Sequence, residues 1–311
     1  MNMINKSNIN TRTPEYDKAF WDAMKFRNPA EDVLSKGKTT IGSNRLPDYT
    51  SGKFTEALNA QSIFRNVGTV IFNQGDHNLW AKDCDDKASW IPEGKPIPIY
   101  NGIDDFTPYQ IKSHKLAAVV RMDEDFVYSP GFNLEKHMVS HMAKAFSRSE
   151  EDAFINGSGV DEPLGILAKE GGAEVSVTAS TFTYDSIVNL YYSVKPEYRK
   201  CGKWLMNDET ALVLRKIKDA DGNYIWNHNN DTILGKEVLI SEYMPSIEIE
   251  KCPVVFGDFS YYWIIDRDHF SVKALREKFA MNSQVGYLGF EFLDGLLVRK
   301  DAIKALVISA E

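Results

Sequence analysis

Three short segments carry residue types that bind phosphates or metals in other proteins. Gly37-Lys38-Thr39 has the form of the end of a phosphate-binding loop, but Asp32 stands where that loop needs its first glycine. Gly157-Ser158-Gly159 begins like a dinucleotide fingerprint, but Glu162 replaces the third glycine. Residues 219–223 carry acidic residues around Gly222, but their spacing does not fit a calcium loop. We interpret them as a turn with positive φ at the glycine.

Histidines and cysteines offer no stronger site. His137 and His141 are four residues apart on a predicted helix, so they could share a face and a metal, but no glutamate base stands between them. The favoured interpretation is two surface or half-buried side chains. Cys84, Cys201 and Cys252 are far apart in the sequence, and such a sparse, odd set is typical of reduced thiols. The sequence therefore predicts no catalytic, cofactor or metal site, and no enzyme.

The composition is that of a globular protein. Hydrophobic residues make up 43% and charged residues 26% of the 311 residues, and the formal net charge is −8. An acidic chain should not bind DNA or an anionic membrane through bulk electrostatics. No apolar run approaches the roughly 20 residues that cross a bilayer. The polar segment 1–12 has no apolar core of a secretory signal, so we expect no membrane association.

The first 47 residues are mostly polar, with one amphipathic stretch at residues 14–24. Thr13 and Pro14 suit the start of a helix, and Tyr16, Phe20 and Trp21 give it an aromatic face. A helix this short is marginal alone, so that face needs another surface. Residues 1–53 carry nine basic and six acidic residues. We expect either a tail with a docking helix or an arm that lies across a neighbouring subunit.

An unusual acidic segment follows at residues 74–110. It holds seven acidic and three basic residues, with Trp80, Trp90 and several prolines between them. The ends have strand character, whereas prolines at alternating positions suit an extended edge. A long hairpin without a core of its own is marginal in isolation. The segment therefore predicts a hairpin that lies on another chain.

The strongest helix pattern in the chain covers residues 133–155. Asn133 is a good N-cap, and Gly157 is expected to end the helix in a left-handed conformation. The apolar face is formed by Leu134, Met138, Met142, Ala145, Phe146 and Ala153. At 1.5 Å per residue this helix is about 33 Å long and can act as a strut. Residues 54–73 predict a short helix and a strand, and residues 111–128 predict another strand.

Helix and strand patterns alternate irregularly in the second half. Thr183 and Asn207 are predicted helix caps. Strand patterns cover residues 204–206, 238–240, 254–256, 262–266, 289–292 and 305–308. The irregular alternation favours the α+β class.

Ordered motifs give the chain a resemblance to a known family. Ala88-Ser89-Trp90-Ile91-Pro92-Glu93-Gly94 is followed by strand 115–120, by residues 150–157 and by Pro163-Leu164-Gly165-Ile166-Leu167. In the second half the matching motifs lie at residues 204–207, 214–219, 221–226, 234–238, 244–245, 256–259, 265–267 and 294–295. In this order they resemble the major capsid proteins of tailed bacteriophages, with the Hong Kong 97-type fold. The resemblance covers the chain from about residue 12 to the C-terminus.

The resemblance implies an anatomy for the chain. A long spine helix lies on an antiparallel sheet in the P-domain, beside a mixed α/β A-domain, an extended hairpin called the E-loop and an N-terminal arm. The implied boundaries are 1–47 for the N-arm, 48–73 for the first part of the P-domain, 74–112 for the E-loop, 113–163 for the P-domain with spine helix 133–155, 164–262 for the A-domain, 263–295 for the return of the P-domain sheet, and 296–311 for the C-terminal strand of the A-domain.

The resemblance also implies a function. The chain would be the shell protein of a phage head, assembling with itself into pentamers and hexamers around double-stranded DNA, with weak non-specific contact to that DNA. Scaffolding, portal and decoration proteins would be further partners. It would be assembled in the host bacterial cytoplasm and reside in the virion, with no cofactor. The alternatives are an encapsulin-type nanocompartment shell and a soluble enzyme with an unrecognised site.

The N-terminal arm and the hairpin at residues 74–110 have no core of their own, and they supply the candidate intersubunit residues. They are Tyr16, Phe20, Trp21, Trp80, Lys82, Lys87, Trp90 and Lys95. A subset of the family crosslinks its subunits through an E-loop lysine, for which Lys82, Lys87 and Lys95 are the available residues; the alternative is that all three are solvated loop lysines.

Overall fold

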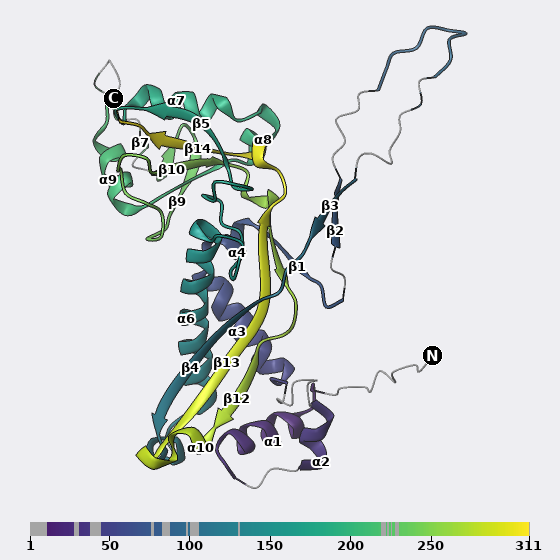
Figure 1. Ribbon diagram of the computed structural model, residues 1–311, viewed down its shortest axis with the longest axis vertical. Coiled ribbons are helices and arrows are strands. Elements are labelled where there is room, and N and C mark those ends of the chain that lie inside the picture. The colour runs from purple at the N-terminus through teal and green to yellow at the C-terminus, as the bar shows by residue number, and fades with distance from the viewer. Residues whose placement is uncertain are drawn as a thin grey trace.

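The computed structural model describes residues 11–27, 31–37, 45–75, 78–82, 88–97, 99, 106–129, 131–218, 222, 224, 226–227 and 230–310. Figure 1 shows an elongated lower part, a wider upper part and a hairpin that projects away from both. The class is α+β, as the sequence predicts.

The described strands form three sheets. One contains β1 (Thr69–Phe72), β11 (Tyr262–Asp266), β13 (Gln284–Leu297), β12 (Ser271–Leu275) and β4 (His114–Asp123). The second follows the order β5 (Glu174–Ala179), β14 (Ile303–Ile308), β10 (Val254–Gly257), β6 (Lys203–Met206), β9 (Lys236–Ile240), β8 (Thr232–Ile233) and β7 (Trp226–Asn227). The third is the hairpin of β2 (Asn78–Lys82) and β3 (Phe106–Gln110).

Strand β13 is the central strand of the elongated part. Along one edge it pairs with β4 over ten positions, from Gln284↔Asp123 to Leu293↔His114. Along the other edge it pairs first with β12 and then with β11. The predicted P-domain strands near residues 55–73, 111–122 and 263–295 are thus brought together in one sheet, although the pairing itself could not be read from the sequence.

The long helix α6 (Leu134–Asn156) packs on this sheet beside α3 (Asp48–Gln61), as Figure 1 shows. The predicted N-cap is confirmed, because the Asn133 side chain accepts a hydrogen bond from the Lys136 amide. Met138, Met142 and Phe146 are buried in the same core as Phe54 of α3. The helix predicted within residues 54–73 begins earlier than expected, and the short helix α4 (Ile63–Val67) separates it from β1.

The end of α6 corrects one prediction. Gly157 has φ −59°, so it does not take the left-handed conformation that the sequence suggested. Its role is steric, because a Cβ there would lie 2.2 Å from the Pro163 carbonyl oxygen and 2.4 Å from the Ala153 carbonyl oxygen. The glycine lets the chain leaving α6 pass close to the returning loop.

Gly157→Ala is therefore expected to lower the free energy of unfolding by about 1–3 kcal/mol, since two backbone carbonyls must move. Gly52→Ala is the matched control. Gly52 lies inside α3 with open space at its Cβ position, so alanine there should stabilise by about 0.5–1 kcal/mol. Urea denaturation of both variants measures the two changes, and equal effects would contradict the steric role of Gly157.

The remaining helices are mostly short. In the first part of the chain they are α1 (Pro14–Met24), α2 (Glu31–Leu34) and α5 (Glu124–Tyr128). Later come α7 (Tyr184–Ser193), α8 (Pro196–Cys201), α9 (Asp208–Lys216) and α10 (Arg276–Phe279). Thr183 and Asn207 cap α7 and α9 as predicted. Gly222 has positive φ, as the predicted turn requires.

Candidate functional site

The projecting hairpin displays large apolar side chains to solvent. Trp80 is 60% exposed, Ile97 77% and Ile99 96%, and Trp90 is fully exposed. Figure 1 shows β2 and β3 leading away from the two larger sheets, with residues 88–97 at the far end of the projection. A soluble monomer rarely exposes apolar side chains at this density. The described part of the hairpin is therefore shaped for contact with another surface.

The base of the hairpin is fixed to the five-stranded sheet. Ala81 and Ile111 are buried in a small cluster with Ile265, Leu296 and Val298. The Tyr109 hydroxyl donates a hydrogen bond of 2.6 Å to the Val298 carbonyl oxygen. Because side-chain burial and hydrogen bonding both hold the base, the direction of the hairpin is set by the body of the chain.

A second surface lies on the face of the five-stranded sheet opposite α6. Alternate residues of β13 point to opposite faces. A Cβ at Gly289 would contact Met142 of α6, which places Leu288, Phe290 and Phe292 on the other face. There Leu288 and Phe292 are half-buried, and Phe290 is buried between its neighbours. Val119, paired with Leu288, is 46% exposed.

Basic side chains border this apolar strip. Lys115 and Arg121 are exposed on β4, and Lys273 is exposed on β12 opposite Leu288. The Lys115 ammonium lies 5.0 Å from the centre of the Phe290 ring. The strip and these cations together are called the sheet face below. It has the apolar centre and charged rim that are typical of protein interfaces.

A buried ionic network ties the elongated part together. The Arg65 guanidinium of α4 donates to both carboxylate oxygens of Glu150 on α6, at 2.7 Å and 2.6 Å. It also donates to both oxygens of Asp266 at the end of β11, each at 3.0 Å. Glu291 of β13 lies beside them, and its Oε1 has no hydrogen-bond partner. Burial, followed by the charge of Glu150, raises the pKa of Glu291 well above its ordinary value.

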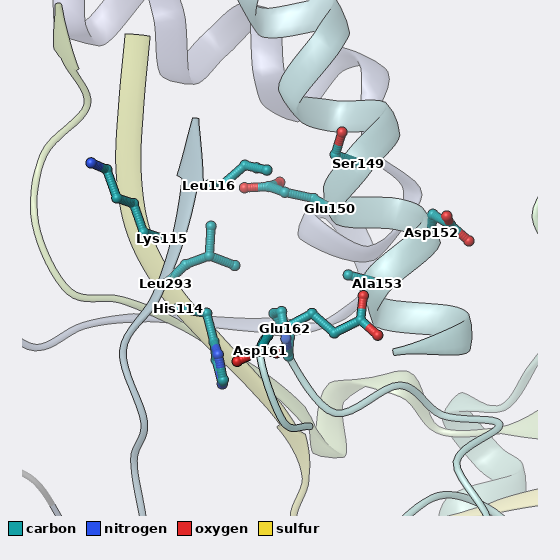
Figure 2. Close-up of a pocket in the computed structure, with 11 residues that line it drawn as sticks. His114, Lys115, Leu116, Ser149, Glu150, Asp152, Ala153, Asp161, Glu162 and Leu293 are labelled. Atoms are coloured by element: carbon teal, nitrogen blue, oxygen red, sulfur yellow. The ribbon is translucent and has the colours of Figure 1, made fainter. Parts of the chain in front are cut away.

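A cavity of about 240 Å³ adjoins this network between β4 and the C-terminal half of α6. Figure 2 shows Glu150 and Leu116 at one end and His114, Asp161 and Glu162 at the other. Near the second end, the buried Asp294 carboxylate accepts hydrogen bonds from the amides of Lys112 (2.6 Å) and Gly295 (2.8 Å). Burial raises the pKa of Asp294. The Glu150 and Asp294 carboxylates are thus both engaged in contacts that hold the fold together.

Metal and membrane sites are not found in the described residues. No group of three or more His, Cys, Asp or Glu side chains there could hold a metal ion. The rings of His137 and His141 are 5.8 Å apart at their centroids. None of the helices in the described ranges is both long and apolar enough to cross a membrane.

The structure separates the predicted intersubunit residues into two groups. Tyr16 and Phe20 are fully buried in the core of this same chain, and the Tyr16 hydroxyl donates to the Arg45 carbonyl oxygen at 2.6 Å. The two side chains therefore pack within their own chain, and not on a neighbouring subunit as the sequence suggested. The aromatic face of α1 finds its surface within the chain, where the Tyr287 hydroxyl also donates to the Met24 carbonyl oxygen at 2.9 Å. Trp21 is half-buried beside them.

The hairpin residues remain available for contact. Trp80, Trp90 and Lys95 are exposed. Lys82 lies in β2, but its side chain is outside the described residues, as is all of Lys87. The sheet face was missed by the sequence prediction. Its signal was present in the alternation of residues 115–121, yet a strand pattern does not say which of its faces is covered by helices.

The fold defines a class of protein: a long helix on an antiparallel sheet, a mixed α/β part and a projecting hairpin form a Hong Kong 97-type capsid subunit. The model of the phage capsid family matches residues 42–308. The chain belongs to this family, whose members are structural components of virions and not enzymes.

Individual relatives agree with this assignment. The capsid of an empty GTA particle is 28% identical, with a TM-score of 0.67, over 80% of this chain and 90% of that one. A structure from Gordonia phage Cozz is 14% identical, with a TM-score of 0.58, over 81% and 87% of the two chains, and supports the fold alone. The probable major capsid protein gp17 of Mycobacterium phage L5 is 26% identical over 201 residues. That match spans 61% of this chain and 60% of the relative.

Proposed function

We propose that this chain is the major capsid protein of a tailed phage, and that it assembles with copies of itself into pentamers and hexamers of a closed shell. The observation that carries the proposal is the hairpin, because a fixed base directs exposed tryptophan and isoleucine side chains away from the chain's own core. Heterologous contacts that each bury a modest area can close into a stable shell when every subunit makes several of them.

The hairpin and the sheet face form a complementary pair. Residues 74–110 carry seven acidic and three basic residues, whereas Lys115, Arg121 and Lys273 surround the apolar strip of the sheet face. Opposite charges around apolar centres align two surfaces and exclude wrong registers. The hairpin of one subunit accordingly lies on the sheet face of its neighbour.

The domain boundaries follow the same proposal. The five-stranded sheet with α3 and α6 is the P-domain, the hairpin is the E-loop, and the seven-stranded sheet with α7, α8 and α9 is the A-domain that surrounds the symmetry axes. Residues 1–47 form the N-arm, whose helix α1 is seated on the P-domain core. Scaffolding, portal and decoration proteins are the further partners, double-stranded DNA is the enclosed cargo, and assembly takes place in the host cytoplasm.

Electron microscopy of the purified chain tests the proposal. We expect closed icosahedral particles, and nucleic acid inside those isolated from infected cells. A small oligomer under all assembly conditions would contradict a shell function, and particles filled with an enzyme would indicate a nanocompartment instead.

A further inference from the structure

The exposed side of α6 carries an uninterrupted basic stripe. Its members are Lys136, His137, His141, Lys144 and Arg148, which recur at the spacing of one helical face. No acidic residue occurs between Lys136 and Arg148. The distance along the axis from the first member to the last is about 18 Å. Figure 1 shows α6 at the margin of the elongated part, away from the hairpin.

The lysine and arginine side chains of the stripe form no ion pair with a described residue. Other cations, such as Lys53, Arg65 and Lys304, are paired. Glu151, Asp208 and Glu242 line a hollow of about 470 Å³ with Lys144 and Arg148, yet none of these three carboxylates forms an ion pair with the two cations. Like charges one turn apart destabilise a helix by a few tenths of a kcal/mol. An external anion bound to the stripe would remove this repulsion.

The chemistry of the stripe indicates which kind of anion. Between its cations the exposed positions hold only Ser140, and no large apolar side chain of the stripe is exposed. A protein partner needs an apolar centre to bind stably, and the sheet face has one whereas the stripe does not. Contacts to a nucleic-acid backbone need cations and hydrogen-bond donors alone, and lysine, arginine and histidine side chains supply both.

We propose that the stripe on α6 is a non-specific binding site for the phosphate backbone of nucleic acid. The inference rests on the proposed shell function, and it requires that the helix side of the P-domain face the enclosed DNA while the sheet face meets neighbouring subunits. Three cations give weak, salt-sensitive binding, which holds a duplex near the wall without fixing its sequence or its position. The negative net charge of the chain limits the affinity further.

Fluorescence anisotropy of a labelled 30-base-pair duplex with unassembled subunits tests this site. Three phosphate contacts predict that affinity falls about 40-fold between 50 and 200 mM salt. The variant Lys136→Gln/Lys144→Gln/Arg148→Gln should lose this binding. The matched control is Lys169→Gln/Lys216→Gln/Lys251→Gln, which removes the same charge from exposed lysines elsewhere and should keep it.

Equal losses in the two triple variants would overturn the proposal, because bulk charge would then explain the binding. Undiminished binding in the stripe variant would overturn it as well, and would point to a protein partner if shells also failed to form. Should the triple variant unfold, Lys144→Gln and Arg148→Gln singly must each reduce the salt slope by about 0.9. Microscopy of the same variants reports shell formation separately, so failure of the shell function is distinguished from failure of this site.

Discussion

Replacing residues 83–105 with a short glycine-rich turn should abolish shell formation and leave a folded, soluble subunit. The replacement removes Trp90, Ile97 and Ile99, which are exposed and contribute nothing to the subunit's own core. It keeps β2, β3 and the buried Ala81 and Ile111 that anchor the hairpin base. Because each subunit would lose one contact in every repeat of the shell, the loss is multiplied over the whole particle. Negative-stain microscopy should show no particles where the parent chain forms them.

Two controls show whether the loss comes from the contact itself. Thermal unfolding of the unassembled variant should match that of the unassembled parent to within a few degrees, since the described residues of the replaced segment are all exposed. Reversing the charge of the sheet face with Lys115→Glu/Arg121→Glu/Lys273→Glu should also block assembly, because the acidic hairpin would then meet an acidic surface. Normal particles from the shortened chain would show that the hairpin is not an assembly element.

Much of the fold could be predicted from local signals. Helix α6 has a cap, an apolar face and a stop within one continuous segment, so its bounds were predicted to within a residue. The caps at Thr183 and Asn207 were equally local. Signals of this kind act over three or four residues and are visible in a single sequence.

Long-range packing set the features that were missed. The sequence predicts a left-handed backbone conformation at Gly157. In the structure the glycine instead makes room for the Pro163 carbonyl of a loop that passes over it. Tyr16 and Phe20 were expected to seek a neighbouring subunit because a short helix cannot bury its own aromatic face. The structure instead brings that face against α3, α6 and β13, which lie far along the chain.

The functional surfaces also differ in whether the sequence alone could predict them. Composition alone indicated that the hairpin is an interaction element, since acidic residues, tryptophans and prolines in one segment leave no local core. The sheet face and the stripe on α6 depend on which side of each element the rest of the chain covers. A strand pattern or a helix pattern identifies two faces, but only the packing of the sheet against α3 and α6 decides which one remains exposed.

The buried network around Arg65 gives the second large effect. Arg65→Met should lower the free energy of unfolding by about 3–5 kcal/mol, because the buried Glu150 and Glu291 and the half-buried Asp266 would be left together without a cation. Urea denaturation of the unassembled subunit measures this loss. The guanidinium joins α4, α6 and β11, so no single neighbour can replace it. A loss below about 1 kcal/mol would mean that the network contributes little to the fold.

Glu291→Gln should have the opposite effect at neutral pH. Burial raises the pKa of Glu291, so the folded chain keeps a proton that the unfolded chain has released once the pH exceeds about 4.5. The contribution of Glu291 to stability is therefore greatest below that pH and falls as the pH rises toward the raised pKa. Glutamine keeps the shape without the titration, so the variant should gain about 1–3 kcal/mol at pH 8 and nothing near pH 4. Urea denaturation across this range measures the difference, with the exposed Glu56→Gln as control; a gain that does not grow with pH would contradict a protonated Glu291.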